Sequence, residues 1–333
     1  MAEAAIRLRQ VSKSFGTVAA NQDVSMEIPA GEILALLGEN GSGKTTLMNM
    51  LAGIYYPDDG EIYVNGRQVN IRAPKDAYAL GIGMVHQHFK LVDVFTAAEN
   101  TALGNSGERL NLRAVSERIR QICEKYGFVL DPEKKVYDMS VSEKQTLEIV
   151  KVLYRGAEIL ILDEPTAVLT PQETEKLFTV MRNMKQDGKT VIIITHKLSE
   201  VLAISDKVAI LRRGRYIDTV ETKDATEESL TEMMVGEHVE LNIDRPEVEE
   251  KNLRLSVKNL SCYDAEGIKK LSDISFDVFG GEILGIAGVS GNGQKELLEA
   301  IAGLQGTVPE AEICYYAPGE TEGTSLIGKS PRK

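Results

Sequence analysis

The chain has 333 residues, 43% of them apolar and 26% charged, which is the composition and length of a globular protein of about two domains. Fifty acidic residues against 38 basic ones give a formal net charge of −12, which argues against nucleic acid as a partner and against binding to anionic lipid by charge alone. No apolar run approaches the ~18 residues of a membrane-spanning helix, the N-terminus lacks the apolar core of a signal peptide, and the three scattered cysteines favour a reducing cytoplasm.

Strand signals come first along the chain. Val24, Met26 and Ile28 alternate with polar residues, as in a half-buried strand. The uninterrupted apolar run Ile33–Leu37 predicts a buried strand, and residues 46–51 follow it as the start of a helix. A phosphate-binding segment, described below, lies between these two elements.

Helix boundaries are marked further along. Asn111 precedes a helical apolar period and Gly127 follows it, as an N-cap and a C-terminal cap would. Thr170 and Glu173 form a capping box with Pro171 at the first helical position. These boundaries predict one helix after Asn111 and another after Thr170.

Two later apolar runs, residues 159–162 and 191–194, show no alternation and are bounded by charged residues and glycine. Such runs are typical of central strands in a parallel sheet that is covered by helices on both faces. The predicted fold class is therefore α/β.

The chain repeats itself. The segment that begins at Gly31, Gly-Glu-Ile-Leu-Ala-Leu-Leu-Gly, returns 250 positions later at Gly281 as Gly-Glu-Ile-Leu-Gly-Ile-Ala-Gly. The glycines, leucine and alanine that follow recur at the same offset in a strand, loop and helix pattern. An acidic stretch without apolar period, residues 237–252, separates the two copies and predicts a linker.

Residues 38–45, Gly-Glu-Asn-Gly-Ser-Gly-Lys-Thr, match the phosphate-loop pattern G-x-x-x-x-G-K-[ST] between a predicted strand and a predicted helix. Glycines let backbone N–H groups turn toward phosphate oxygens. Lys44 would supply a cation to the β and γ phosphates, and Thr45 a hydroxyl to Mg²⁺. Asp163 and Glu164 follow a buried strand, so Asp163 would hold Mg²⁺ and Glu164 would orient and deprotonate a water.

With these motifs the chain resembles an ATP-binding cassette ATPase over essentially its whole length. By this resemblance Gln87 matches the glutamine that contacts Mg²⁺ and couples the site to a membrane partner. His196 matches the switch histidine at the γ-phosphate, and Phe15 the aromatic residue that stacks on adenine. Each of the three residues, taken alone, has an ordinary structural interpretation, as a surface-loop glutamine, a structural histidine and a core aromatic.

The resemblance implies a full set of site residues. The catalytic residues are Glu164, His196 and Gln87, and the Mg²⁺ ligands are Thr45, Gln87 and Asp163. The residues that bind ATP are Phe15, Gly38, Glu39, Asn40, Gly41, Ser42, Gly43, Lys44, Thr45, Thr46 and Ser140.

The implied fold is a P-loop NTPase cassette, with a parallel-sheet core, an N-terminal antiparallel β subdomain and a helical signature subdomain, followed by a partial second copy. We expect a complete cassette domain at residues 1–237, an acidic linker at 238–253 and the N-terminal part of a second, degenerate cassette at 254–333. The second copy stops before its own carboxylate pair.

Several residues depart from the family pattern. The signature, commonly Leu-Ser-Gly-Gly-Gln, is Met-Ser-Val-Ser-Glu at residues 139–143. Ser140 is retained, whereas Ser142 replaces a glycine and would cost ~1 to 2 kcal/mol if its φ were positive. In the second copy Gln294 and Lys295 stand at the lysine and hydroxyl positions, which predicts weak nucleotide binding there.

The leading hypothesis is an ATPase that energises a fused double-cassette importer, for nucleosides first and simple sugars second. Expected partners are two integral-membrane permease subunits, an extracytoplasmic substrate-binding lipoprotein and a second cassette that completes the ATP sites. The chain would then lie at the cytoplasmic face of the plasma membrane as a peripheral protein. The alternatives are a translation- or DNA-associated cassette protein without a transport role, and a non-catalytic ATP-binding regulator.

Overall fold

The computed structural model describes residues 4–104, 111–236, 252–264, 267–288 and 292–329. The chain forms two compact units, residues 1–241 and 242–333. The predicted linker, residues 238–253, lies largely outside the described residues. Within those residues, no helix is long and apolar enough to cross a bilayer.

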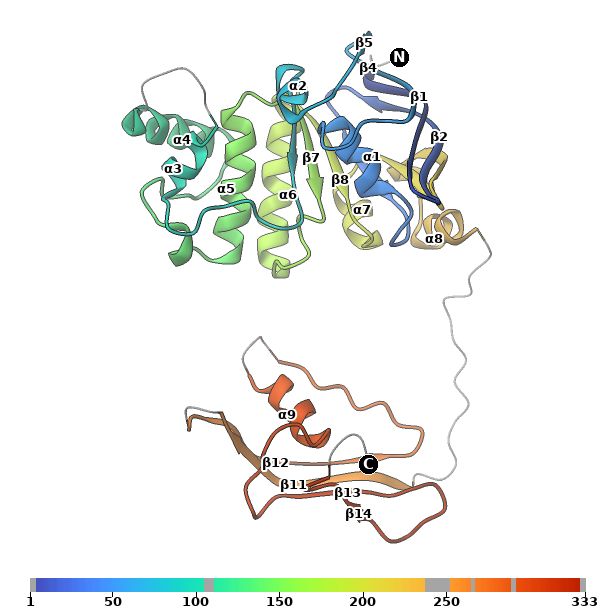
Figure 1. Cartoon of the computed structure of the whole chain (residues 1–333), viewed down its shortest axis with the longest axis vertical. Helices are drawn as coiled ribbons and strands as arrows, with labels where there is room; N and C mark the ends of the chain where they lie inside the picture. The colour runs from blue at the N-terminus through green and yellow to red at the C-terminus, as the bar shows by residue number, and fades with distance from the viewer. Residues whose placement is uncertain (1–3, 105–110, 237–251, 265–266, 289–291, 330–333) are drawn as a thin grey trace. The chain divides into compact units, whose positions relative to one another are not determined.

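The first unit begins with a four-stranded antiparallel sheet of order β2-β1-β4-β5. Its strands are β1 (Ala4–Phe15), β2 (Val18–Pro29), β4 (Asp59–Val64) and β5 (Arg67–Val69). The alternation predicted around Val24 is present, because Val24, Met26 and Ile28 are buried and their neighbours are not. This sheet provides the antiparallel β subdomain that the sequence predicts (Figure 1).

The core of the unit is a six-stranded sheet of order β10-β9-β3-β8-β7-β6. Its strands are β3 (Ile33–Leu37), β6 (Ile82–Val85), β7 (Ile159–Asp163), β8 (Thr190–Ile194), β9 (Lys207–Arg212) and β10 (Arg215–Glu221). All pairings are parallel except that of β10 with β9. Every residue of β3, β7 and β8 is buried, as the unbroken apolar runs predict.

Helices pack on both faces of this sheet and create two apolar cores. Alternate residues of each central strand enter different cores: Leu160 and Leu162 face one, Ile159 and Ile161 the other. Figure 1 shows α3, α4 and α5 at one end of the unit and the antiparallel strands at the other. The helices are α1 (Lys44–Leu51), α2 (Pro74–Ala79), α3 (Ala97–Ala102), α4 (Leu112–Tyr126), α5 (Val141–Tyr154), α6 (Pro171–Gln186), α7 (Leu198–Ile204) and α8 (Glu227–Val235), with short 3₁₀ segments at Val136–Asp138 and Thr222–Asp224.

The predicted helix boundaries are confirmed. The Asn111 side chain caps α4, and Gly127 ends that helix in the left-handed conformation at φ +85°. Thr170 caps α6 and its hydroxyl accepts a hydrogen bond from the backbone N–H of Glu173.

The second unit contains the antiparallel sheet β12-β11-β13-β14 and one helix. Its elements are β11 (Leu253–Tyr263), β12 (Lys269–Phe279), α9 (Gln294–Ile301), β13 (Glu312–Tyr315) and β14 (Thr324–Ser325). This strand order repeats the antiparallel sheet of the first unit, element for element.

Individual hydrogen bonds are repeated as well. The Ser12 hydroxyl accepts a hydrogen bond of 2.9 Å from the N–H of Asp23, and the Ser261 hydroxyl accepts one of 2.9 Å from the N–H of Asp273. Both aspartates adopt a positive φ, +49° and +50°. The two units therefore share local backbone geometry as well as sequence.

The strand expected at the start of the second copy does not form. Residues 282–288 have no regular secondary structure, and Ile283 is 76% exposed whereas its counterpart Ile33 is 1% exposed. In the first unit this strand, β3, lies between β8 and β9. The described residues of the second unit provide no counterpart of either neighbour, so the two strand pairings that β3 makes are not available to this segment.

Candidate active site

The phosphate-loop residues lie between β3 and α1, and glycine is required at both ends of the loop. A Cβ on Gly38 would lie 2.2 Å from the Leu211 carbonyl oxygen, and one on Gly43 would lie 2.3 Å from that of Ala20. Gly43 also adopts φ +94° as the N-cap of α1. Gly41, at φ +82°, has nothing within 4 Å of its Cβ position, so the middle of the loop faces open space.

Lys44 is the first residue of α1, and its side chain turns back onto the loop. Its ammonium group donates to the carbonyl oxygens of Gly38 at 2.7 Å and Glu39 at 2.8 Å. Burial lowers the pKa of Lys44, and the Glu164 and Asp163 carboxylates oppose this shift. The lysine is therefore held inside the loop by groups that a phosphate could replace.

Thr45 and Asp163 connect the loop to the end of β7. The Thr45 hydroxyl lies 3.4 Å from Oδ1 of Asp163 and donates to it. Asp163 is buried, and this burial raises its pKa although the Thr45 hydrogen bond lowers it. The two oxygen-bearing side chains thus meet beside the loop.

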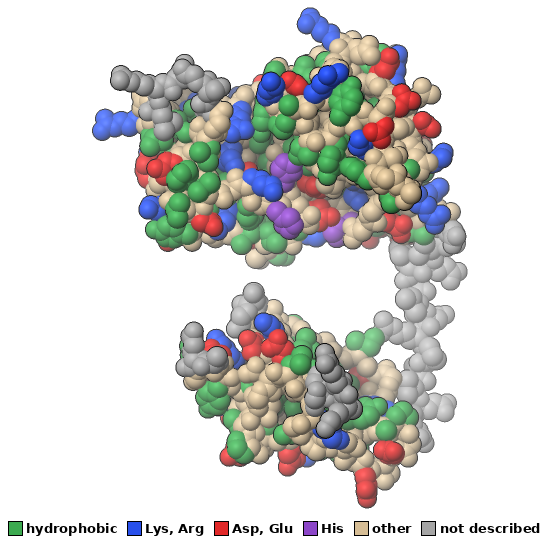
Figure 2. Space-filling model, in the orientation of Figure 1, with side chains coloured by type: hydrophobic (Ala, Val, Ile, Leu, Met, Phe, Trp, Pro, Cys, Tyr) green, Lys and Arg blue, Asp and Glu red, His purple; other side chains and the backbone are tan. Residues whose placement is uncertain are grey.

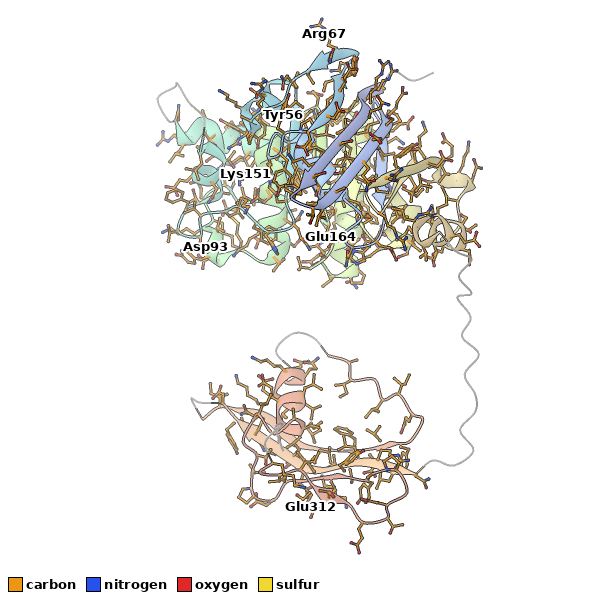
Figure 3. The ribbon with its side chains drawn as sticks, turned by 45° about the vertical axis from the view of Figure 1, so that its right-hand side comes forward. Tyr56, Arg67, Asp93, Lys151, Glu164 and Glu312 are labelled. Carbon is orange, nitrogen blue, oxygen red and sulfur yellow. The ribbon has the colours of Figure 1, made fainter. Side chains whose placement is uncertain are left out.

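Glu164 follows β7, and its side chain contacts residues that follow the two neighbouring strands of the sheet, β6 and β8. Its Oε2 accepts a hydrogen bond of 3.1 Å from Nε2 of Gln87, which follows β6. Its Oε1 lies 3.0 Å from Nδ1 of His196, which follows β8. The Glu164 backbone has φ +46°, an uncommon value for a residue other than glycine, and its N–H donates to the Ile194 carbonyl oxygen at 2.9 Å. Figure 3 labels Glu164, and Figure 2 shows histidine side chains grouped on one face of the first unit.

Phe15 is the last residue of β1 and is 44% exposed. Its ring packs edge-on against Tyr55, with the ring centroids 5.0 Å apart, and the Lys13 ammonium lies 5.6 Å from its centroid. The exposed face can accept a planar ligand. The sequence alone did not mark Tyr55, although an adjacent pair of tyrosines after α1 was a signal for such a contact.

Ser140 stands apart from the other predicted residues. It is exposed at the N-cap of α5, where its hydroxyl accepts from the Glu143 N–H at 3.2 Å. Among the described residues, no hydrogen bond or ion pair joins it to the phosphate loop or to Glu164. Ser142 lies within α5 and is absent from the described residues with positive φ, so the backbone strain considered for it does not arise.

The fold is that of a P-loop domain of the ATP-binding cassette type, and the lysine, hydroxyl and carboxylates lie together at its phosphate loop. Residues 21–167 match the family model described as "ABC transporter". The crystal structure of the ADP conformation of MJ1267, an ATP-binding cassette of an ABC transporter, has a TM-score of 0.61 and 24% identity, covering 70% of this chain and 95% of that one. CbiO1 from Clostridium perfringens, part of the ABC transporter complex cbiONQ, has a TM-score of 0.59 and 26% identity, covering 67% and 90%.

Longer relatives match both units. The nucleoside import ATP-binding protein NupA of Lactococcus lactis is 48% identical over 91% of this chain and 60% of the relative. The guanosine import ATP-binding protein NupO of Bacillus subtilis is 45% identical over 92% and 60%, and the ribose import ATP-binding protein RbsA of Clostridium perfringens is 41% identical over 90% and 60%. The chain spans about 60% of the length of these relatives. Its first unit has the fold of an ATP-binding cassette, and the chain is similar to these import ATP-binding proteins over about 90% of its length.

Proposed function

We propose that this chain is the ATP-hydrolysing subunit of an ABC importer, with nucleosides as the first choice of cargo and simple sugars as the second. The observation that carries the proposal is the convergence of Lys44, Asp163 and Glu164 at one edge of the parallel sheet, with Gln87 and His196 on Glu164. The cargo class is supported by the names of the relatives, which import nucleosides, guanosine and ribose.

ATP would bind to the loop of residues 38–45. The open space at Gly41 leaves room for phosphate oxygens, and Lys44 would exchange its two carbonyl partners for the β and γ phosphates. Phe15 would stack on adenine through its exposed face. The N-terminus of α1, directly after the loop, adds a favourable dipole for the anion.

The same edge offers suitable ligands for Mg²⁺. The Thr45 hydroxyl, the Asp163 carboxylate and the side-chain oxygen of Gln87 are hard oxygen donors, which is the ligand type that Mg²⁺ prefers. When bound, this ion would neutralise charge on the β and γ phosphates. Desolvation raises the pKa of the buried Asp163 carboxylate, and a nearby cation would favour its charged form.

Glu164 would position the attacking water and accept its proton. Gln87 and His196 hold its two carboxylate oxygens, so the carboxylate has a fixed direction before substrate arrives. After ATP binds, His196 would contact the γ-phosphate. Asp163 lies next to Glu164 in the chain but would hold the metal, so the two carboxylates would have separate tasks.

The site also needs a group from another cassette. Ser140 is exposed at the N-terminus of α5 and, among the described residues, its hydrogen bonds are with Glu143 rather than with its own phosphate loop, as expected for a residue that would serve the opposite ATP. We take residues 254–333 as the N-terminal part of a second, degenerate cassette, supported by the repeated strand order. Because Gln294 replaces the lysine there, the functional ATP would occupy the first loop and require a signature from a second cassette domain or copy.

The remaining partners follow from the family. Two permease subunits would provide the membrane path, and an extracytoplasmic binding lipoprotein would deliver the cargo. The chain would then sit at the cytoplasmic face of the plasma membrane, with residues 1–237 as the complete cassette.

Uptake by the reconstituted transporter tests the proposal. Proteoliposomes that contain the chain, its permease subunits and a second cassette, with ATP inside and with the binding lipoprotein and labelled nucleoside outside, should accumulate the nucleoside. Glu164→Gln should abolish this accumulation. If the complex takes up ribose and does not take up nucleoside, the cargo class is simple sugars, the second choice. Failure of the wild-type complex to transport either compound or hydrolyse ATP would contradict the proposed function.

A further inference from the structure

Behind the proposed catalytic residues, a buried carboxylate joins two loops. The Thr166 hydroxyl donates to Oε2 of Glu200 at 2.5 Å, and the Lys197 ammonium donates to Oε1 of Glu200 at 2.8 Å. The same ammonium lies 3.3 Å from the carbonyl oxygen of Thr166. Thr166 is 1% exposed and Glu200 is 9% exposed, so their hydrogen bond is buried, whereas the Lys197 side chain is 39% exposed.

The three residues connect the two loops that carry the proposed chemistry. Thr166 lies two positions after Glu164, and Lys197 directly follows His196. Glu200 lies in the first turn of α7, the helix that follows the histidine loop. The Glu200 carboxylate therefore accepts a hydrogen bond from each loop, one on each of its two oxygens.

We propose that Glu200 is a positioning residue, which holds Glu164 and His196 in register and so sets the rate of ATP hydrolysis without contributing to ATP binding. This inference rests on the proposed function. The role is indirect, because in this structure Glu200 contacts Thr166 and Lys197 rather than the loop of residues 38–45.

The backbone of Glu164 explains why such a support is needed. A φ of +46° is sparsely populated by residues other than glycine and persists only where the surroundings hold it. The constraints on this loop include the hydrogen bond from the Glu164 N–H to Ile194 and the anchoring of Thr166 by Glu200. Loss of the second would let the carboxylate shift relative to His196. A misplacement of about 1 Å can lower a rate by about 100-fold.

Burial makes the network sensitive to single changes. A shielded carboxylate interacts strongly with its donors, and removal of one donor leaves an oxygen without a partner. Thr166→Val removes the hydroxyl at nearly constant volume, and Thr166→Ser retains it. Thr222 offers a matched control near the other end of α7, where its hydroxyl lies 2.8 Å from that of Ser205 in a buried setting.

The test compares these variants in the complete transporter. We expect Thr166→Val to lower kcat about 10- to 100-fold with the Kd for ATP within about 2-fold of wild type. Thr166→Ser should restore most of kcat, and Thr222→Val should leave it unchanged. If Thr166→Val fails to fold, Glu200→Gln replaces it, with the same expected split between kcat and Kd.

A second readout does not depend on turnover. The ¹⁵N chemical shift of His196 Nδ1 in the nucleotide-free chain reports its contact with Glu164. It should change in Thr166→Val and Glu200→Gln and stay constant in Thr222→Val. An unchanged shift and an unchanged kcat would overturn the inference, as would an equal loss of kcat in Thr222→Val. A wild-type complex without ATPase activity would instead contradict the proposed function, and the chemical shift would still decide the positioning role.

Discussion

Nδ1 of His196 lies 3.0 Å from Oε1 of Glu164, although 32 positions separate the two residues in the chain. The proximity follows from the pairing of β7 with β8, because the carboxyl ends of neighbouring parallel strands meet at the same edge. Gln87 reaches the second carboxylate oxygen from the next strand, β6. Glu164 is thus oriented by donors from both sides.

Replacement of Glu164 should separate binding from hydrolysis. We expect Glu164→Gln to retain ATP affinity within about 3-fold and to lower turnover by at least about 100-fold, because a positioned general base contributes 10² to 10⁴ to a rate. Nucleotide titration and phosphate release measure the two quantities in the complete transporter. Glu173→Gln, which alters a carboxylate that caps α6, is the control and should leave turnover unchanged. Substantial turnover in Glu164→Gln would exclude this residue as the base.

Replacement of Lys44 should weaken ATP binding. Lys44→Met retains the length of the side chain and removes its charge, with a loss of about 1.5 to 3 kcal/mol for a charge-assisted hydrogen bond. The Kd for ATP should therefore rise about 10- to 100-fold in equilibrium titration. Lys295→Met, in the second unit, should leave the Kd unchanged, since this side chain is largely exposed and contacts Glu299. Equal effects of the two changes would contradict the assignment.

Asp163 makes stability depend on pH. Burial raises the pKa of Asp163 above its ordinary value of 3.8, so its contribution to stability is present below that value and is lost as pH rises through the folded-state pKa. Asp163→Asn should therefore raise the Tm in metal-free buffer near neutral pH, and the gain should shrink as the pH falls toward 3.8. Thermal unfolding between about pH 4.5 and 8 measures it.

Asp187 provides a control of opposite sign. Hydrogen bonds from Lys125 and Tyr126 lower the pKa of Asp187, so its stabilising contribution is present above 3.8 and is lost as pH falls through the folded-state pKa. Asp187→Asn should lower the Tm near neutral pH. A fall in Tm for both variants would refute the desolvation argument for Asp163.

Ser140 has a structural role as a helix cap and a proposed role in ATP hydrolysis. Thr170, to which we assign only the capping role, provides the control that distinguishes the two. Each caps a helix through the same capping box, so Ser140→Ala and Thr170→Ala should each destabilise the chain by about 1 kcal/mol. Only Ser140→Ala should also lower turnover strongly in the complete transporter, because its hydroxyl would contact the ATP of the opposite cassette. Denaturant unfolding and phosphate release provide the comparison. Equal turnover in the two variants would leave Ser140 with its capping role alone.

Local rules predict much of this fold. The unbroken apolar runs of β3, β7 and β8 identify the central strands, and side-chain caps fix the starts of α4, α5 and α6. The phosphate-loop glycines were predictable because close approach of the backbone restricts residue type. These features depend on neighbours in the sequence.

Features that depend on distant partners were not predictable in the same way. The repeat indicates a strand near Ile283, yet a strand forms only where neighbours supply hydrogen bonds. Likewise, Thr166 and Glu200 are ordinary polar residues in the sequence, and only the pairing of β7 with β8 brings them together. Tertiary contact, rather than local propensity, determines both.

The stoichiometry of ATP binding decides whether the first phosphate loop alone binds the nucleotide. We expect one ATP on the loop of residues 38–45 and little or none on the second loop, where Gln294 replaces the lysine. Isothermal titration of the 333-residue chain with ATP and Mg²⁺ should give one high-affinity site, which Lys44→Met weakens strongly and Lys295→Met does not. Two equivalent sites, or one site that is insensitive to Lys44→Met, would contradict the account.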